Sequence, residues 1–215
     1  MIYLIGMIVV SYLIGSIPTS IIAGKLLRGK EYDIRKDAKG SGNAGATNVF
    51  RLLGWKTGVV VLLIDMLKGL IPTVWFAKLG AQTGLGWETV NFQILAGLSA
   101  VFGHIWTIFA GFKGGKGVGT GAGMVIGLAP LAVLICLGVF VATVALSRFV
   151  SLGSILASLT LPVVLFVQRF AMGGNVPVQL LIFSLFIPAL ILYTHRSNLK
   201  RLLRGTENKI QLRKS

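Results

Sequence analysis

The chain is poor in charge, and above all in negative charge. Only 13% of its 215 residues are charged, against about 25% in soluble domains, and its 6 acidic residues face 21 lysines and arginines. The single cysteine, Cys136, lies in an apolar run, so neither an internal disulfide nor a cysteine metal site can form within one chain. A water-soluble globular protein is therefore excluded, and a membrane protein with basic loops is indicated.

Hydrophobic residues make up 54% of the chain and gather in long segments. A helix needs about 20 mostly apolar residues to cross the roughly 30 Å of bilayer hydrocarbon. The first segment has no positively charged start and no small-residue cleavage site, so it is interpreted as a retained span and not as a signal peptide. Segment 117–129 is short, but Pro130 separates it from the next run, so it counts as a span. The predicted spans are 2–24, 57–77, 92–110, 117–129, 131–147, 152–169 and 177–194.

The distribution of positive charge orients these seven spans. One side of the membrane receives 18 lysines and arginines, whereas the other receives Lys78 and Arg169, and Lys68 lies within a span. Since cytoplasmic loops carry the excess of positive charge, the amino terminus is predicted outside and the carboxyl terminus in the cytoplasm. Six spans would not give this bias. The expected fold is an all-α polytopic bundle of seven transmembrane helices in a single domain, 1–215.

The first polar segment, GSGNAGATNVFR at 40–51, crowds small residues, hydroxyls and amides between two spans. Glycines let backbone N–H groups approach a ligand, and the neutral side chains add donors around Arg51, which suits an anionic, oxygen-rich ligand. The alternative is a flexible turn followed by a helix capped by Thr47 or Asn48, with Arg51 as an interfacial anchor. The candidate ligand groups are Ser41, Gly42, Asn43, Thr47, Asn48 and Arg51.

The second polar segment is Gly103-His104 followed by GFKGGKGVGT at 111–120. It resembles a phosphate-binding loop without being a Walker A motif, because Lys116 is followed by glycine, so nucleotide hydrolysis is not implied. Unhindered N–H groups, two lysines and the start of a helix favour a bound phosphate. His104 is interpreted as either a catalytic base or, preferably, a buried group that fixes the loop. The candidate phosphate-binding residues are Lys113, Gly114, Gly115, Lys116 and Gly117.

The third polar segment, SRFVSLGSI at 147–155, is a tight turn with three hydroxyls and one arginine. Ser151 and Ser154 are candidate binding residues. Ser151 is equally plausible as a helix N-cap, and Arg148 as an interfacial anchor, so the structural interpretation stays open beside the functional one.

The fourth polar segment, 195–209, follows the last span. If the helix continues, His195 and Asn198 share one face with Arg201. Both are uncharged at neutral pH, so they are interpreted as site residues and not as a lipid anchor. The basic residues of this region are expected to lie on anionic membrane lipid: Lys200, Arg204, Lys209, Arg213 and Lys214.

Asp65 and Lys68 lie within the second span, where charged side chains are usually paired or functional. At positions i and i+3 they can pair on one helix face, so they are either a structural pair or part of the site. The acidic residues are scattered and no His/Asp/Glu cluster has ligand spacing. No metal and no cofactor are therefore predicted.

Together the segments GSGNAGATNVFR, GHIWTIFAGFKGGKGVGT, SRFVSLGSI and HRSNLKRLLRGTENK resemble the bacterial acyl-phosphate-dependent glycerol-3-phosphate acyltransferases, known as PlsY, over nearly the whole chain. The resemblance implies an enzyme of phospholipid biosynthesis in the bacterial inner membrane, with its active site facing the cytoplasm. It would move a fatty acyl group from acyl phosphate to the 1-hydroxyl of sn-glycerol 3-phosphate, giving lysophosphatidic acid and phosphate. No nucleic acid and no obligate protein partner are implied.

The resemblance also implies roles for individual residues. The catalytic residues, which hold glycerol 3-phosphate, would be Ser41, Arg51, Lys116, His195 and Asn198. Acyl phosphate would lie against the amides of Gly114 to Gly117, with Thr47 and Asn48 nearby.

The histidine–aspartate pair of other acyltransferases, His-x-x-x-x-Asp, is absent, because Phe109 and Lys200 stand five residues after the two histidines. Acyl phosphate carries a good leaving group, so direct attack without an acyl-enzyme is the mechanistic hypothesis. The proton acceptor stays open between a substrate phosphate oxygen and His195. A small-anion transporter is the competing interpretation, but the polar residues gather on one side of apolar spans and leave no polar route across.

Overall fold

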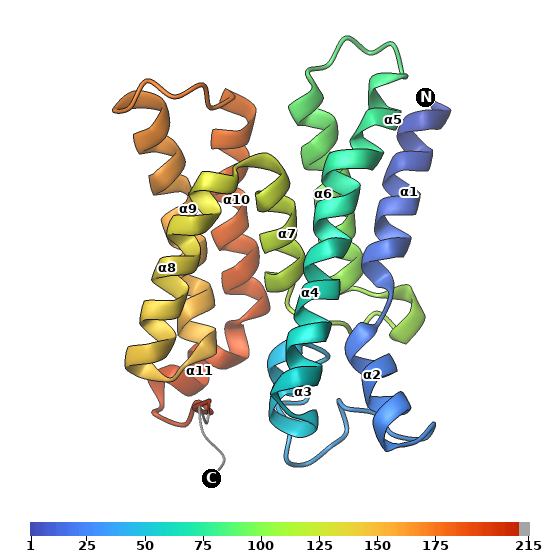
Figure 1. Ribbon diagram of the computed structural model, residues 1–215, viewed down its shortest axis with the longest axis vertical. Helices are drawn as coiled ribbons and strands as arrows, with labels where there is room; N and C mark the ends of the chain where they lie inside the picture. Colours follow the sequence, from blue (N-terminus) through green and yellow to red (C-terminus); the bar gives the residue numbers. More distant parts are fainter. Residues whose placement is uncertain (211–215) are drawn as a thin grey trace. The chain divides into compact units, whose positions relative to one another are not determined.

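The computed structural model describes residues 1–210, in which all regular secondary structure is helical (Figure 1). The chain divides into an amino-terminal unit, Met1–Leu128, and a carboxy-terminal unit that begins at Ala129. The amino-terminal unit contains α1 Ile2–Ser16, α2 Thr19–Arg28, α3 Ala46–Leu53, α4 Trp55–Ile71, the π-helix η1 Pro72–Phe76, α5 Ala77–Ala81, α6 Thr89–Ile105, the 3-10 helix η2 Ile108–Ala110 and α7 Val118–Leu128. The carboxy-terminal unit contains α8 Pro130–Ser147, α9 Val150–Phe170, α10 Val178–Thr194 and α11 Arg196–Leu203.

Within the amino-terminal unit, α1 packs along α6 and α4 packs along α7. Glycines allow both pairs to approach closely, because a Cβ at Gly103 would overlap the backbone of Tyr12, and one at Gly123 would overlap the backbone of Met66. Small residues at helix contacts are the usual means of close packing in membranes. The start of α7 is thereby held against the middle of α4.

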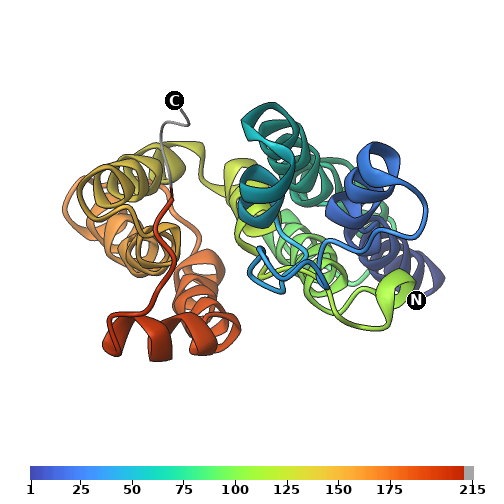
Figure 2. The same cartoon turned by 90° about the horizontal axis from the view of Figure 1, so that it is seen from below.

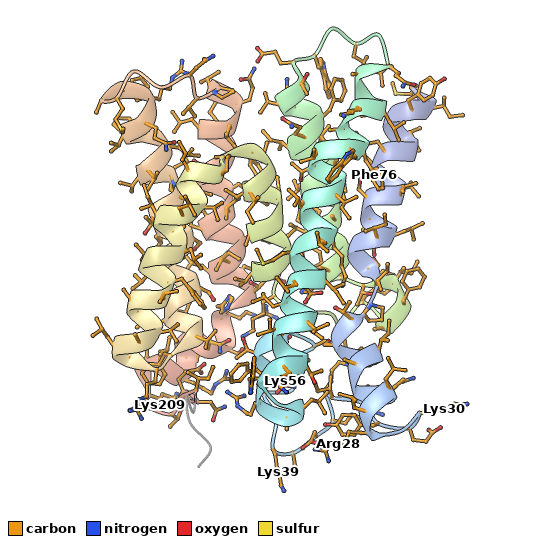
Figure 3. The ribbon with its side chains drawn as sticks, in the orientation of Figure 1. Arg28, Lys30, Lys39, Lys56, Phe76 and Lys209 are labelled. Carbon is orange, nitrogen blue, oxygen red and sulfur yellow. The ribbon has the colours of Figure 1, made fainter. Side chains whose placement is uncertain are left out.

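The two ends of the amino-terminal unit differ in charge. The amino terminus and the α5–α6 connection lie at one end, and α2, α3 and their connection lie at the other (Figure 1). Arg28, Lys30, Lys39 and Lys56 all lie at the α2–α3 end, opposite Phe76 (Figure 3). Seen from that end, the connection from α2 to α3 crosses the unit beside the segment that leads from α6 to α7 (Figure 2).

The first predicted span, 2–24, is broken. Pro18 has no N–H group and its ring opposes a continuous helix, so α1 ends at Ser16 and α2 begins at Thr19. Proline has a similar effect in α4, which passes into the π-helix η1 at Pro72. Such irregular turns leave backbone groups that need other partners.

In the carboxy-terminal unit, α8 and α9 are joined by a tight turn in which Arg148 is left-handed, with φ +63°. The last span does not continue straight into the fourth polar segment. Instead α10 ends at Thr194, and α11 begins at Arg196 with a bend of 66°. The helix therefore does not continue through His195, so the condition under which His195 would share one face with Asn198 and Arg201 is not met.

Five helical stretches are long and apolar enough to cross a membrane, among the residues described: Ile2–Arg28, Trp55–Ala81, Thr89–Ala110, Pro130–Ser147 and Val150–Phe170. The bent pair α10–α11 makes a sixth if it is counted as one span. The predicted span 117–129 corresponds to α7, whose 11 residues rise about 16 Å, roughly half of the hydrocarbon thickness. A multi-pass membrane fold is confirmed, whereas the count of seven stays a prediction.

Candidate functional site

The first polar segment folds around Asn48, which is only 1% exposed. Its Oδ1 accepts a hydrogen bond from the Ser41 N–H at 2.8 Å, and its Nδ2 donates to the Ile34 carbonyl at 3.1 Å. Both ends of the amide are therefore used to hold the loop against α3. Asn48 positions Ser41, whose side chain is exposed.

Helix α3 begins without a side-chain cap, because its N-cap residue is Gly45. The alternative that Thr47 or Asn48 caps this helix is wrong, since both lie inside it. Arg51 lies in the last turn of α3 and is half-buried. No hydrogen bond or ion pair of its guanidinium is found within residues 1–210.

The second polar segment closes over the end of α6. The Gly114 N–H donates to the Ile105 carbonyl and the Gly115 N–H donates to the His104 carbonyl, both at 3.0 Å. These bonds satisfy carbonyls that a helix end leaves open. A Cβ at Gly114 would overlap the His104 carbonyl, and one at Gly115 would overlap the imidazole Nε2. Glycine is required here by close approach, and these two amides are engaged within the protein.

The remainder of the segment leads into α7. Lys113 is exposed and Lys116 is half-buried. Gly117 has a left-handed φ of +82°, which turns the chain into the first residue of α7. The positive end of the α7 dipole and the two lysines therefore lie on one short stretch of chain.

Arg35, in the connection between α2 and α3 that precedes the first segment, binds the second. Its Nη1 donates to the Ala110 carbonyl at 2.8 Å and to the Lys113 carbonyl at 3.0 Å. Its Nε and Nη2 bind the carboxylate of Asp33, with the shortest contact at 2.7 Å. The hydrogen bond from Arg35 holds the pKa of Asp33 below its usual range, and the same bond raises the pKa of Arg35. Sequence reasoning missed this pair, although an Asp-x-Arg stands out in a chain so poor in acidic residues.

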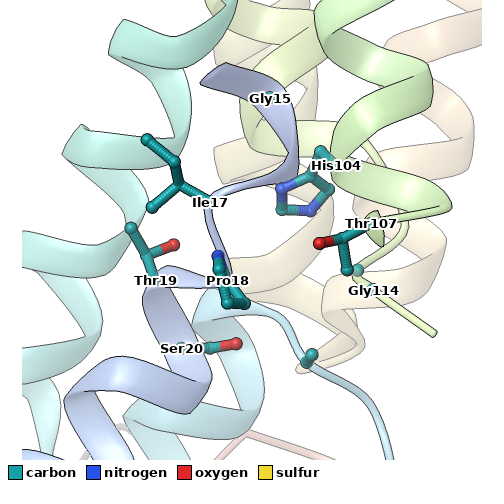
Figure 4. A pocket seen from close by; sticks show the side chains of 10 residues that line it. Gly15, Ile17, Pro18, Thr19, Ser20, His104, Thr107 and Gly114 are labelled. Atoms are coloured by element: carbon teal, nitrogen blue, oxygen red, sulfur yellow. The ribbon is translucent and has the colours of Figure 1, made fainter. Parts of the chain in front are cut away.

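A small pocket lies under the break in the first span (Figure 4). Ile17 and Thr19 stand on one side of it, and His104 and Thr107 on the other. The hydroxyl of Thr107 donates to the carbonyl of Ser16 at the end of α1. The cavity, of about 10 Å³, has room for roughly one water molecule. Its walls come from Gly15, Ile17, Pro18, Thr19, Ser20, Ala44, His104, Thr107, Gly114 and Gly115.

His104 is 8% exposed and lies beneath the second segment. Its Nδ1 is 3.7 Å from Oδ1 of Asp65, and its ring packs against Gly115. Asp65 itself pairs with Lys68 at 2.7 Å, as their i, i+3 spacing allowed. The position of His104 agrees with its interpretation as a group that fixes the loop.

In the carboxy-terminal unit, the carboxylate of Glu207 accepts hydrogen bonds from residues of both the third and the fourth segment. Its Oε1 accepts hydrogen bonds from Asn198 Nδ2 at 2.6 Å and from Ser151 Oγ at 2.9 Å, and its Oε2 accepts from Arg201 Nε at 2.7 Å. Burial alone would raise the pKa of Glu207, but these three hydrogen bonds outweigh it and lower the pKa. Sequence reasoning gave Glu207 no role.

The start of α9 rules out one interpretation of the third segment. The N-cap of α9 is Phe149, with no side-chain cap, so the interpretation of Ser151 as an N-cap is wrong. Ser154 donates to the Val150 carbonyl of its own helix at 3.0 Å. Asn198 and Arg201 do share a face of α11, as expected, because both bind Glu207.

His195 stands at the bend between α10 and α11 and is only 3% exposed. Its Nδ1 lies 2.9 Å from the Ile191 carbonyl. A carbonyl can only accept, so Nδ1 carries the hydrogen, and the neutral ring then has its lone pair on Nε2.

No group of three or more His, Cys, Asp or Glu side chains within residues 1–210 is arranged to hold a metal ion.

Comparison with known proteins identifies the family. Residues 5–205 match the family model described as glycerol-3-phosphate acyltransferase. The chain belongs to the glycerol-3-phosphate acyltransferase family. The glycerol-3-phosphate acyltransferase of Chlorobium luteolum is 47% identical over 238 residues, covering 100% of both chains. That of Chlorobaculum tepidum is 48% identical over 232 residues, covering 98% of this chain and 97% of the relative.

Solved structures of the family are similar to this chain in fold and in sequence. The glycerol 3-phosphate form of PlsY, an integral membrane glycerol-3-phosphate acyltransferase, has a TM-score of 0.82 and 38% identity, covering 97% of this chain and 96% of that one. The lysophosphatidic acid form of PlsY has a TM-score of 0.79 and 37% identity, covering 97% and 95%. As a member of the glycerol-3-phosphate acyltransferase family, the chain is an acyltransferase and a multi-pass membrane protein.

Proposed function

We propose that this protein transfers a fatty acyl group from acyl phosphate to the 1-hydroxyl of sn-glycerol 3-phosphate, releasing lysophosphatidic acid and phosphate. The observation that supports this most strongly is the match of residues 5–205 to the acyltransferase family. PlsY was crystallised in forms with the acceptor and with the lysophospholipid product. The choice of acyl phosphate as donor rests on the resemblance of all four polar segments to that enzyme.

The reaction proceeds by direct attack. The 1-hydroxyl oxygen adds to the acyl carbonyl carbon, a new ester bond forms, and the bond to the phosphate oxygen breaks with its electron pair leaving on phosphate. The hydroxyl proton passes to a phosphate oxygen or to Nε2 of His195, which carries the lone pair of the neutral ring. Because phosphate is a good leaving group, positioning and charge stabilisation supply most of the catalysis.

The proposed catalytic residues divide by chemistry. Arg51 and Lys116 stabilise negative charge on phosphate, and Ser41 and Asn198 hydrogen-bond the acceptor beside His195. Asn198 is oriented for this role by Glu207.

The residues proposed to bind the donor phosphate differ in part from those that the sequence suggested. The amides of Gly114 and Gly115 are engaged with α6, so donor phosphate is assigned to Lys113, Lys116, Gly117 and the first turn of α7. The two glycines serve by allowing the loop to lie on His104. The further members of the set, with binding or supporting roles, are Gly42, Asn43, Thr47, Asn48, Ser151 and Ser154.

We also propose seven spans in the bacterial inner membrane, with the amino terminus outside and the active site facing the cytoplasm. Both units form one acyltransferase domain that needs no cofactor and no obligate protein partner, and its basic tail contacts anionic membrane lipids. The gathering of Arg28, Lys30, Lys39 and Lys56 at one end of the amino-terminal unit supports this orientation. Arg213 and Lys214 of the tail lie outside the described residues.

Cysteine labelling tests the orientation. In a Cys136→Ser background, single cysteines at Lys39 and Gln82 should react differently with a membrane-impermeant maleimide in intact cells. Gln82→Cys should label and Lys39→Cys should label only after the membrane is opened. The reverse pattern would overturn the orientation.

The activity is tested by phosphate release from palmitoyl phosphate by the purified protein in detergent. Release should depend on glycerol 3-phosphate, and acyl-CoA or acyl-carrier protein should not replace the donor. Lysophosphatidic acid should appear in equal amount. Release without an acceptor, or product formed only from the other donors, would contradict the proposal.

A further inference from the structure

A buried ion pair anchors the break in the first span. Lys68 is 3% exposed, and its Nζ donates to the Ile17 carbonyl at 2.6 Å, to Asp65 Oδ1 at 2.7 Å and to Thr19 Oγ1 at 2.9 Å. An ammonium has three hydrogens, and three acceptors meet them. Thr19 in turn donates to Asp65 Oδ1 at 2.5 Å. The pair therefore ties α4 to both sides of the break.

The same carboxylate faces the second polar segment. Asp65 Oδ1 lies 3.7 Å from Nδ1 of His104, whose carbonyl accepts the Gly115 N–H at 3.0 Å. The imidazole fills the space beside Gly115 so closely that a Cβ there would overlap Nε2. Asp65 also lies beside the first turn of α7, where a Cβ on Gly119 would come within 3.3 Å of its Cβ.

Neighbouring contacts thus connect the break between α1 and α2 with segment 111–117, which contains Lys113 and Lys116. We propose that Asp65 is a positioning residue for segment 111–117: it holds the break through Lys68 and Thr19, and through His104 it sets the position of Gly115. The effect on substrate rests on the proposed function, in which Lys113 and Lys116 bind phosphate. Displacement of this segment would move the two lysines away from the phosphate and weaken its binding.

An ion pair suits this role better than an apolar contact. Its hydrogen bonds have direction, so they fix the Ile17 carbonyl, the Thr19 hydroxyl and α4 in one arrangement, whereas apolar packing permits sliding. Removing one charge alone would leave the other buried without its partner, which is strongly destabilising. The informative variant therefore removes both charges.

The first experiment compares the double variant Asp65→Asn/Lys68→Met with the wild type, measuring KM for each substrate, kcat and thermal unfolding in detergent. We expect KM for the phosphate-bearing substrates to rise about tenfold, with kcat changed less than about threefold. The matched control is Thr73→Ala, which removes another buried hydrogen bond on the same helical stretch, from Thr73 Oγ1 to the Gly69 carbonyl at 2.8 Å. It should lower the unfolding temperature and leave KM unchanged.

A double variant with lower unfolding temperature and wild-type KM values would overturn the proposal, because Asp65 would then be an anchor and nothing more. An inactive wild type would instead refute the proposed function, so the two failures are distinct.

A second test applies even if the charge-free variant is not recovered folded. Gly115→Ala should raise KM, because its methyl group would overlap the imidazole of His104. In a His104→Ala background the same methyl has room, so the KM of the double variant should stay within about twofold of that of His104→Ala. If the KM increases of the two single variants multiply in the double variant, His104 does not set the position of Gly115, and the proposal is wrong.

Discussion

Asn198 Nδ2 donates a hydrogen bond to Oε1 of Glu207 at 2.6 Å, and Ser151 donates to the same oxygen at 2.9 Å. One carboxylate oxygen thus ties the start of α9 to α11 and to the chain that follows it. The amide of Asn198 is given a definite orientation by this bond, so Glu207 controls how a proposed catalytic side chain is presented.

Glu207→Gln should destabilise the protein. A glutamine has one acceptor oxygen and cannot replace a carboxylate that accepts from Asn198, Ser151 and Arg201 together. We expect a loss of about 1 to 3 kcal/mol, the range for hydrogen bonds to charged groups, measured by thermal unfolding in detergent at neutral pH. Glu31→Gln, at an exposed acidic residue, is the matched control and should unfold like the wild type. Equal unfolding temperatures for both variants would contradict the role of Glu207.

The contribution of Glu207 should depend on pH. Its pKa is lowered from 4.5 in the folded protein, so the folded state favours the ionised form more than the unfolded state does. The resulting stability is fully present above the unfolded pKa and is lost as pH falls through the lower folded value. The difference in unfolding temperature between the wild type and Glu207→Gln should therefore shrink below about pH 4.5. A difference that stays constant down to pH 3 would show that ionisation of Glu207 is not involved.

Arg35→Lys should impair substrate binding even though it keeps the charge. Lysine cannot bind the Asp33 carboxylate through two nitrogens while also donating to the Ala110 and Lys113 carbonyls. With the α2–α3 connection no longer held to the backbone of Ala110 and Lys113, KM for glycerol 3-phosphate should rise about tenfold. Lys36→Ala, at the exposed neighbouring residue, should leave KM unchanged. If both variants behave like the wild type, Arg35 does not position the loops.

Arg51→Ala and Lys116→Ala should each lower kcat/KM by at least about a hundredfold, the effect of removing a group that stabilises developing negative charge. Lys209→Ala is the control, since Lys209 is exposed and lies over the ring of Phe149. It should retain nearly full activity in the phosphate-release assay. Similar losses in all three variants would mean that general basic charge, and not these two side chains, supports catalysis.

Hydrophobic runs were sufficient to predict most of the helices, because a long apolar segment in a membrane has few alternatives to a helix. They did not predict the bend at His195, which contains neither proline nor glycine. The break at Pro18 falls where proline would be expected to interrupt a helix. Lys68, which donates hydrogen bonds to residues on both sides of this break, lies 49 residues after Thr19. No local pattern indicates such a pairing.

The candidate site shows the same limit. The glycines of segment 111–117 were interpreted as unhindered N–H groups for a phosphate, but the N–H groups of Gly114 and Gly115 bind carbonyls at the end of α6. Asn48 was expected to contact ligand or to cap a helix. The capping alternative is wrong, and both ends of its amide close a loop. Arg35 reaches a carbonyl 75 residues away, a contact between a side chain and a backbone group that leaves no trace in residue spacing.

The close packing of α4 on α7 and of α1 on α6 has a practical consequence for protein engineering. Replacing helical glycines by alanine is a common way to stabilise a protein, and it raises the free energy of unfolding by roughly 0.5 to 1 kcal/mol where the helix tolerates a methyl group. Gly69, Gly103 and Gly123 are closed to it, because the neighbouring backbone already occupies the space. Gly6 in α1 and Gly138 in α8 have nothing within 4 Å of an added Cβ. A detergent-stable form of this enzyme should therefore be sought by changing those two positions, while the glycines at the helix contacts are left alone.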